Sequence, residues 1–138
     1  MKKIGILFTI LLSTFVLSAQ ETSSTVSVTI ENVLNANGTI LASLHTSDTF
    51  MKGAGVIDLS KAAEKGSVTF TFENVVPGTY AIMVLHDEND NKRMDFEANG
   101  MPKENYGMSG NEMAMGPPTF ADAQFEVTEE NTELIIRF

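Results

Sequence analysis

Short runs in which apolar and polar residues alternate make up most of the chain after its N-terminal segment. In the run from Thr25 to Val33, the residues Val26, Val28 and Ile30 fall on one face, with polar residues between them. This two-residue period is typical of a half-buried strand. Five more runs rich in β-branched and aromatic residues also predict strands. They cover residues 38–45, 67–72, 78–86, 123–127 and 132–138.

Helical periodicity is weak in the same part of the chain. The segment DLSKAAEK, Asp58–Lys65, predicts at most two helical turns, with Asp58 or Ser60 as the N-cap. The segment Gly100–Phe125 is rich in Gly, Pro, Asn and Met and predicts one long irregular loop. Short strands without a long helix predict an all-β fold, an antiparallel β-sandwich of about seven strands.

Two segments of the chain are similar in sequence. Residues 29–45 read TIENVLNANGTILASLH and residues 71–86 read TFENVVPGTYAIMVLH. Each predicts a β-hairpin, because Asn37-Gly38 supplies the positive φ angles of a tight turn and Pro77-Gly78 suits a type II turn. The similarity fits an internal duplication and also fits two separate solutions to one turn, and both interpretations stay open.

The N-terminal residues have the pattern of a secretory signal peptide. Two lysines precede the apolar run Ile4–Leu17, and small residues follow it. The run is too short to stay in a membrane as a spanning helix. We therefore expect residues 1–19 to be removed, which leaves a single domain over residues 20–138. That domain is expected outside the cytoplasm, periplasmic or secreted, without a membrane anchor.

Charge and cysteine content narrow the possible partners. Two of the 9 basic residues fall in the predicted signal peptide, so 7 remain against 18 acidic residues, a net charge of −11. Nucleic acid and anionic membrane surfaces are therefore not expected as partners. The chain has no cysteine, which excludes disulfides and thiolate metal sites.

The loop HDENDNKRMD, residues 86–95, places oxygen-bearing side chains in the order of a calcium-binding loop. Aspartate or asparagine holds its first, third, fifth and ninth positions, counted from Asp87, and this alternation turns the oxygens toward one centre. Calcium prefers six to eight oxygens, and Glu97 or Glu104 is available to complete the set. The predicted ligands are Asp87, Asn89, Asn91, Asp95 and Glu104.

Two positions depart from the calcium pattern. Lys92 stands where such loops usually have glycine, and Ala98 stands where they carry a bidentate glutamate. The alternative interpretation is a loop in which Asp and Asn side chains bond their own backbone in Asx turns. With two carboxylates and two amides, a calcium site here would have a Kd of about 10⁻⁴ to 10⁻³ M.

Three ordered motifs give the chain a resemblance to a known family. The runs VPGTYAIMVLHDENDN, GMPKENYG and GPPTFADAQF resemble the signature of domain-of-unknown-function family 2141, a secreted bacterial family. The resemblance covers nearly all of the chain after residue 19. It implies a small exported β-sandwich, Ig-like or prealbumin-like and similar to the regulatory domains of carboxypeptidases, with no established activity. Members of the family typically show glycine where this chain has Asp90 and Lys92. The positions that match the motifs are Asp87, Asn89, Asn91, Asp95, Gly100, Pro102, Glu104, Tyr106, Gly107, Gly116, Pro117, Pro118, Phe120, Asp122 and Ala123.

The function that we expect is non-enzymatic. It is an exported binding or accessory module for a protein or glycan ligand, with Gly100–Pro118, Tyr106 and Phe120 as its contact surface. An extracytoplasmic copper carrier is a further alternative, because thioethers select Cu(I). It would need Met113 and Met115 to share one exposed site with His45 or His86.

A hydrolase-type enzyme is the main alternative. His86, Asp87 and Glu104 supply titratable groups for acid and base chemistry. The sequence contains no Gly-x-Ser-x-Gly elbow, no His-Glu-x-x-His helix and no phosphate-binding glycine loop. A convergent polar pocket around the three residues would favour the enzyme, and an apolar face would favour the binding module.

Overall fold

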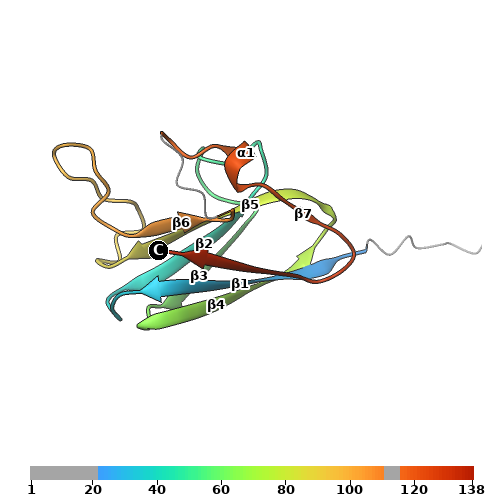
Figure 1. Ribbon diagram of the computed structural model, residues 1–138, viewed down its shortest axis with the longest axis horizontal. Helices are drawn as coiled ribbons and strands as arrows, with labels where there is room; N and C mark the ends of the chain where they lie inside the picture. The colour runs from blue at the N-terminus through green and yellow to red at the C-terminus, as the bar shows by residue number, and fades with distance from the viewer. Residues whose placement is uncertain (1–21, 111–115) are drawn as a thin grey trace, which may run out of the picture.

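The computed structural model describes residues 22–110 and 116–138. In this part of the chain two β-sheets form two layers, with one short helix beside β5 (Figure 1). The elements are β1 (Ser24–Val33), β2 (Thr39–His45), β3 (Ile57–Ala62), β4 (Gly66–Val75), β5 (Gly78–Asp87), β6 (Tyr106–Met108), α1 (Phe120–Ala123), β7 (Phe125–Val127) and β8 (Thr132–Arg137). The first sheet has the order β4-β1-β8, and the second has the order β3-β2-β5-β6, with β7 paired to β5. The prediction of an all-β sandwich is confirmed.

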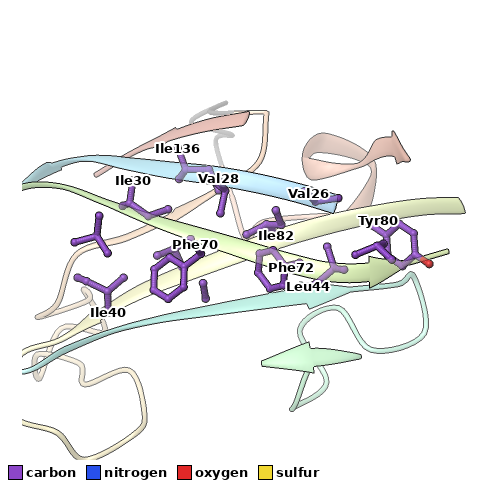
Figure 2. Close-up of a cluster of buried hydrophobic side chains, with 14 of the residues drawn as sticks. Val26, Val28, Ile30, Ile40, Leu44, Phe70, Phe72, Tyr80, Ile82 and Ile136 are labelled. Carbon is purple, nitrogen blue, oxygen red and sulfur yellow. The ribbon is translucent and has the colours of Figure 1, made fainter. Parts of the chain in front are cut away.

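The core lies between the two sheets. Val26, Val28 and Ile30 have no solvent exposure, as the alternation in β1 predicts. Phe70 and Phe72 of β4 belong to the same sheet, and Figure 2 shows these side chains pointing toward residues of the second sheet. Full burial of side chains of this size contributes about 1.5–3 kcal/mol each. The apolar faces of the strands therefore hold the two sheets together.

The helix predicted for Asp58–Lys65 is wrong. Residues Ile57–Ala62 form β3, which pairs antiparallel with β2 at the edge of the second sheet. Ile57 and Leu59 pack against the core. The polar residues between and after them are exposed. Ile57 and Leu59 are two residues apart, and this spacing buries one face of a strand. Ile57 lies just before the segment predicted to be helical.

Neither predicted hairpin forms. β1 and β2 lie in different sheets, as do β4 and β5, so each of the two similar segments crosses from one sheet to the other. Asn32 and Asn74, which are equivalent in the repeated Glu-Asn-Val, have φ angles of 64° and 56°. Each lies at a register shift between β1 and β4. Bulges of this kind bend a strand and increase its twist. The repeated sequence therefore marks a bend between sheets.

The remaining elements close the sandwich at one side. β8 pairs parallel to β1, whereas the other strand pairs in the described residues are antiparallel. The segment predicted as a long irregular loop contains both β6 and α1. Thr119 caps α1 by accepting a hydrogen bond from the Asp122 N–H. Within residues 22–110 and 116–138 no helix is long and apolar enough to cross a membrane. The predicted signal peptide lies outside these residues.

Candidate functional site

Four of the five predicted metal ligands lie in the segment between β5 and β6, and hydrogen bonds connect this segment to the fifth, Asp87. Asp87 ends β5 and is 1 % exposed. Its carboxylate accepts hydrogen bonds from the backbone N–H groups of Asn91 at 3.1 Å and Lys92 at 2.8 Å. Both carboxylate oxygens of this buried residue therefore hold the turn that follows it.

Glu104 holds the two sides of the same loop together. Its carboxylate accepts the N–H of Glu88 at 3.1 Å and the N–H of Asp95 at 3.2 Å. The side chain is 7 % exposed. Like Asp87, it acts as an acceptor for backbone N–H groups of the loop.

Asp95 receives the side-chain amides of the loop. Asn89 and Asn91 each donate from Nδ2 to Asp95 Oδ2 at 2.7 Å. The hydrogen bond from Asn89 is the main cause that lowers the pKa of Asp95, with Asn91, Arg93 and Lys103 acting in the same direction. The ionised carboxylate is thus the form that the loop stabilises.

The orientation of the amides favours a loop closed by its own hydrogen bonds. The Oδ1 atoms of Asn89 and Asn91 accept the N–H groups two residues further on, which makes two consecutive Asx turns. Calcium would require these oxygens to face the centre of the loop. In the part of the chain that the structure describes, no group of three or more His, Cys, Asp or Glu residues is arranged to hold a metal ion. Calcium binding stays a prediction.

Two residues of the loop have left-handed backbone. The φ angles are 58° at Asp90 and 62° at Lys92, the two places where the family resemblance implies glycine. This conformation costs an ordinary L-residue about 1–2 kcal/mol. Asp90 is also tied to β2, because Thr39 Oγ1 donates to its carboxylate at 2.6 Å. The sharp turn that the calcium pattern assigns to glycine is therefore present with Lys92 in that place.

The predicted acid and base residues do not form a cluster of their own. His86 has no solvent exposure, its Nε2 is hydrogen-bonded to the Asn37 carbonyl oxygen at 2.8 Å, and its ring stacks on Phe138. Asp87 and Glu104 are occupied by backbone N–H groups. Among the described residues no hydrogen bond joins any two of these three side chains. His86 Nδ1 is buried and has no hydrogen-bond partner among the described residues. The hydrolase alternative stays a prediction.

A groove with a volume of about 360 Å³ lies over the outer face of the second sheet. Side chains of β2 and β5 that face away from the core form its floor. The turn after β2, the loop after β5, the strand β6 and the segment before α1 complete it. The lining residues are Leu41, Ser43, His45, Met51, Met83, Val84, Leu85, Met94, Phe96, Pro102, Tyr106 and Pro118. The sequence did not predict this groove, although the unbroken apolar run Ala81–Leu85 is a signal that both faces of β5 are covered.

His45 is a polar residue in this otherwise mostly apolar lining. It is 3 % exposed, its Nδ1 is hydrogen-bonded to Thr49 Oγ1 at 3.2 Å, and its ring lies edge-on to Phe50. Burial lowers the pKa of His45, and the negative charge of Asp58 offsets part of that shift. The imidazole is therefore neutral at neutral pH. Ser43 and Tyr106 are the other lining side chains with a polar group.

The predicted contact residues have different places. Tyr106 lines the groove and is 42 % exposed. Phe120 packs instead on Phe50, with ring centroids 5.8 Å apart, in a small apolar cluster below α1. Met113 and Met115 lie outside the described residues. His45 and His86 are both buried, and His45 lines the groove. The copper alternative that pairs a histidine with Met113 and Met115 stays a prediction.

A comparison of the chain with known protein families agrees with the resemblance carried by the three sequence motifs. Residues 28–135 match the family described as "Uncharacterized protein conserved in bacteria (DUF2141)". The chain belongs to this family. No curated protein and no solved structure matches it. Of the positions that carry the DUF2141 motifs, Pro102, Tyr106 and Pro118 line the groove, and Asp87 and Glu104 hold the loop beside it.

Proposed function

We propose that this DUF2141 protein is an exported, non-enzymatic binding module that holds a compact, neutral, apolar ligand in the groove over β2 and β5. The observation that carries the proposal is the groove itself. Its volume of about 360 Å³ is within the range of small-molecule sites, and such sites are mostly apolar with a few polar groups. The signal-peptide pattern of residues 1–19 supports a place outside the cytoplasm.

The lining side chains indicate the chemical class of the ligand. Three methionines, Met51, Met83 and Met94, adapt their flexible side chains to irregular apolar shapes. The net charge of −9 for the whole chain disfavours an anion. A glycan presents many hydroxyl groups, for which this lining has few partners. A neutral apolar molecule with one hydrogen-bonding group fits best, since Ser43 or Tyr106 can orient that group.

Fluorescence titration with N-phenyl-1-naphthylamine, a neutral apolar probe, tests the proposal. The purified protein is expected to bind the probe saturably with a blue-shifted emission. Leu85→Lys places a charge in the groove and should weaken binding by about tenfold or more. Leu34→Lys is the matched control, because Leu34 is 65 % exposed and lies outside the groove. Absence of saturable binding, or equal binding by Leu85→Lys, would contradict the proposal.

A further inference from the structure

The lining of the groove combines two kinds of soft metal ligand. His45 and the thioether side chains of Met51 and Met83 all line it. These three residues come from the end of β2, from the turn that follows it, and from β5. The apolar ligand of the proposed function does not require this combination.

The imidazole of His45 is held in one orientation with one nitrogen unused. Nδ1 is hydrogen-bonded to Thr49 Oγ1, and the ring is packed edge-on against Phe50. Thr49 Oγ1 is fixed in turn, since it accepts the Thr46 N–H at 3.1 Å. Metal-ligating histidines usually have their second ring nitrogen held by a hydrogen bond. Nε2 has no hydrogen-bond partner among the described residues, and the residue lines the groove.

The two thioethers belong to residues that line the same groove as this imidazole. Met83 pairs with Ser43 across β2 and β5, so its side chain is on the same face as His45 and diagonal to it. Diagonal neighbours of this kind are within reach of long side chains. Met51 follows a turn closed by the hydrogen bond from the Phe50 N–H to the Thr46 carbonyl at 3.0 Å. Its φ angle of 58° is unusual for methionine.

We propose that the groove binds Cu(I) beside His45, through His45 Nε2 and the thioether sulfurs of Met51 and Met83. Thioether and imidazole ligands suit Cu(I), whereas hard cations prefer oxygen. The set of two thioethers and one imidazole carries no charge, so bound Cu(I) keeps its single positive charge, which the net charge of −9 of the chain favours. The site differs from the copper alternative drawn from the sequence, which relied on Met113 and Met115.

Competition with the Cu(I) chelator bicinchoninate under anaerobic conditions tests this site. The purified protein is expected to withdraw one Cu(I) per chain. Met51→Leu and Met83→Leu keep the apolar volume and should each weaken binding by about tenfold or more, as should Thr49→Val, which releases the imidazole. Met101→Leu is the matched control, because Met101 is 61 % exposed and does not line the groove. The double variant Met113→Leu/Met115→Leu should bind as the wild type does.

Two results would overturn the proposal. One is a wild-type protein that withdraws no Cu(I), and the other is unchanged affinity in Met51→Leu and Met83→Leu. X-ray absorption at the copper edge adds a direct readout, with sulfur and one imidazole nitrogen expected as ligands. Binding of N-phenyl-1-naphthylamine without copper is measured separately, so failure of the copper site and failure of the proposed function are distinguishable.

Discussion

Gly107 of β6 lies so close to Ile136 of β8 that a Cβ atom at position 107 would be 2.6 Å from Ile136 Cγ2. The same Cβ would be 3.1 Å from the Arg137 carbonyl oxygen. β6 belongs to the second sheet and β8 to the first, so this contact brings the edges of the two sheets together. The approach of the two strands depends on the absence of a side chain at position 107.

Gly107→Ala should therefore destabilise the protein by about 1–3 kcal/mol, the usual cost of forcing extra atoms into a packed site. Urea unfolding followed by circular dichroism measures the change. The double variant Gly107→Ala/Ile136→Ala provides the control, because it removes the Cγ2 atom that the new methyl group meets. Strictly additive losses in this cycle would show that the contact is not the cause.

Lys92→Gly should stabilise the protein. Lys92 has a φ angle of 62°, and glycine adopts this conformation without a steric penalty, so we expect a gain of about 1 kcal/mol in the free energy of unfolding. Lys65→Gly is a suitable control, since Lys65 is exposed and does not have a positive φ angle. That variant should lose a few tenths of a kcal/mol or more through the added freedom of the unfolded chain. Equal losses in both variants would contradict the argument from backbone strain.

The buried imidazole of His45 should make the protein less stable in mild acid. Burial lowers the pKa of His45 below its ordinary value of 6.5. Above that pH the imidazole is neutral in both states and the stability is complete. As the pH falls below 6.5 toward the lower pKa of His45 in the folded protein, this histidine is protonated first in the unfolded chain. The free energy of unfolding therefore falls.

Urea unfolding at about pH 7.5 and about pH 5.5 measures this loss of stability. His45→Gln should reduce the difference between the two pH values. Asp58→Asn should increase it, because the Asp58 charge raises the pKa of His45. A difference that is the same in wild type and in His45→Gln would assign the acid sensitivity to other groups.

Asp87→Ala should destabilise the protein even in EDTA. It removes the acceptor of the Lys92 N–H and one of the two acceptors of the Asn91 N–H, a cost of about 1–3 kcal/mol. Asp87→Asn keeps one carbonyl acceptor and should lose less. If Asp87→Ala is as stable as the wild type in EDTA, the hydrogen-bonding role of Asp87 is contradicted.

Thermal unfolding in EDTA and in calcium tests the ion in the same variants. Binding to the folded state alone would add about 2.7 kcal/mol at a calcium concentration of about 100 times Kd. A rise of this kind that Asp87→Ala abolishes would confirm the calcium prediction. Equal stability of the wild type with and without calcium would make that prediction wrong and leave the Asx turns as the whole explanation of the loop.

Local patterns predicted the strands well and their partners poorly. The alternation of Val26, Val28 and Ile30 identified β1, because burial of one face requires it. The turn signals Asn37-Gly38 and Pro77-Gly78 identified real changes of direction, but a turn does not determine which strand the next one pairs with. The bends at Asn32 and Asn74 carry the chain from the first sheet into the second, once after β1 and once after β4.

The candidate sites show the same limit. The spacing of the loop from Asp87 to Asp95 predicted oxygens turned toward one centre. In the structure the side-chain N–H groups of Asn89 and Asn91, not their oxygens, face Asp95. The groove is formed by side chains from segments that are far apart in the sequence, which no local pattern connects. Only the fold brings Met51, Met83 and Tyr106 to one place.

Methionine methyl resonances give the most direct test of the groove as a binding site. In protein labelled with ¹³C at the methionine methyl groups, titration with N-phenyl-1-naphthylamine should shift the signals of Met51, Met83 and Met94, which line the groove. The signal of Met101, which is exposed outside it, should stay in place. Shifts confined to Met101, or no shift in the three groove methionines at saturating probe, would contradict the proposal that this groove binds the ligand.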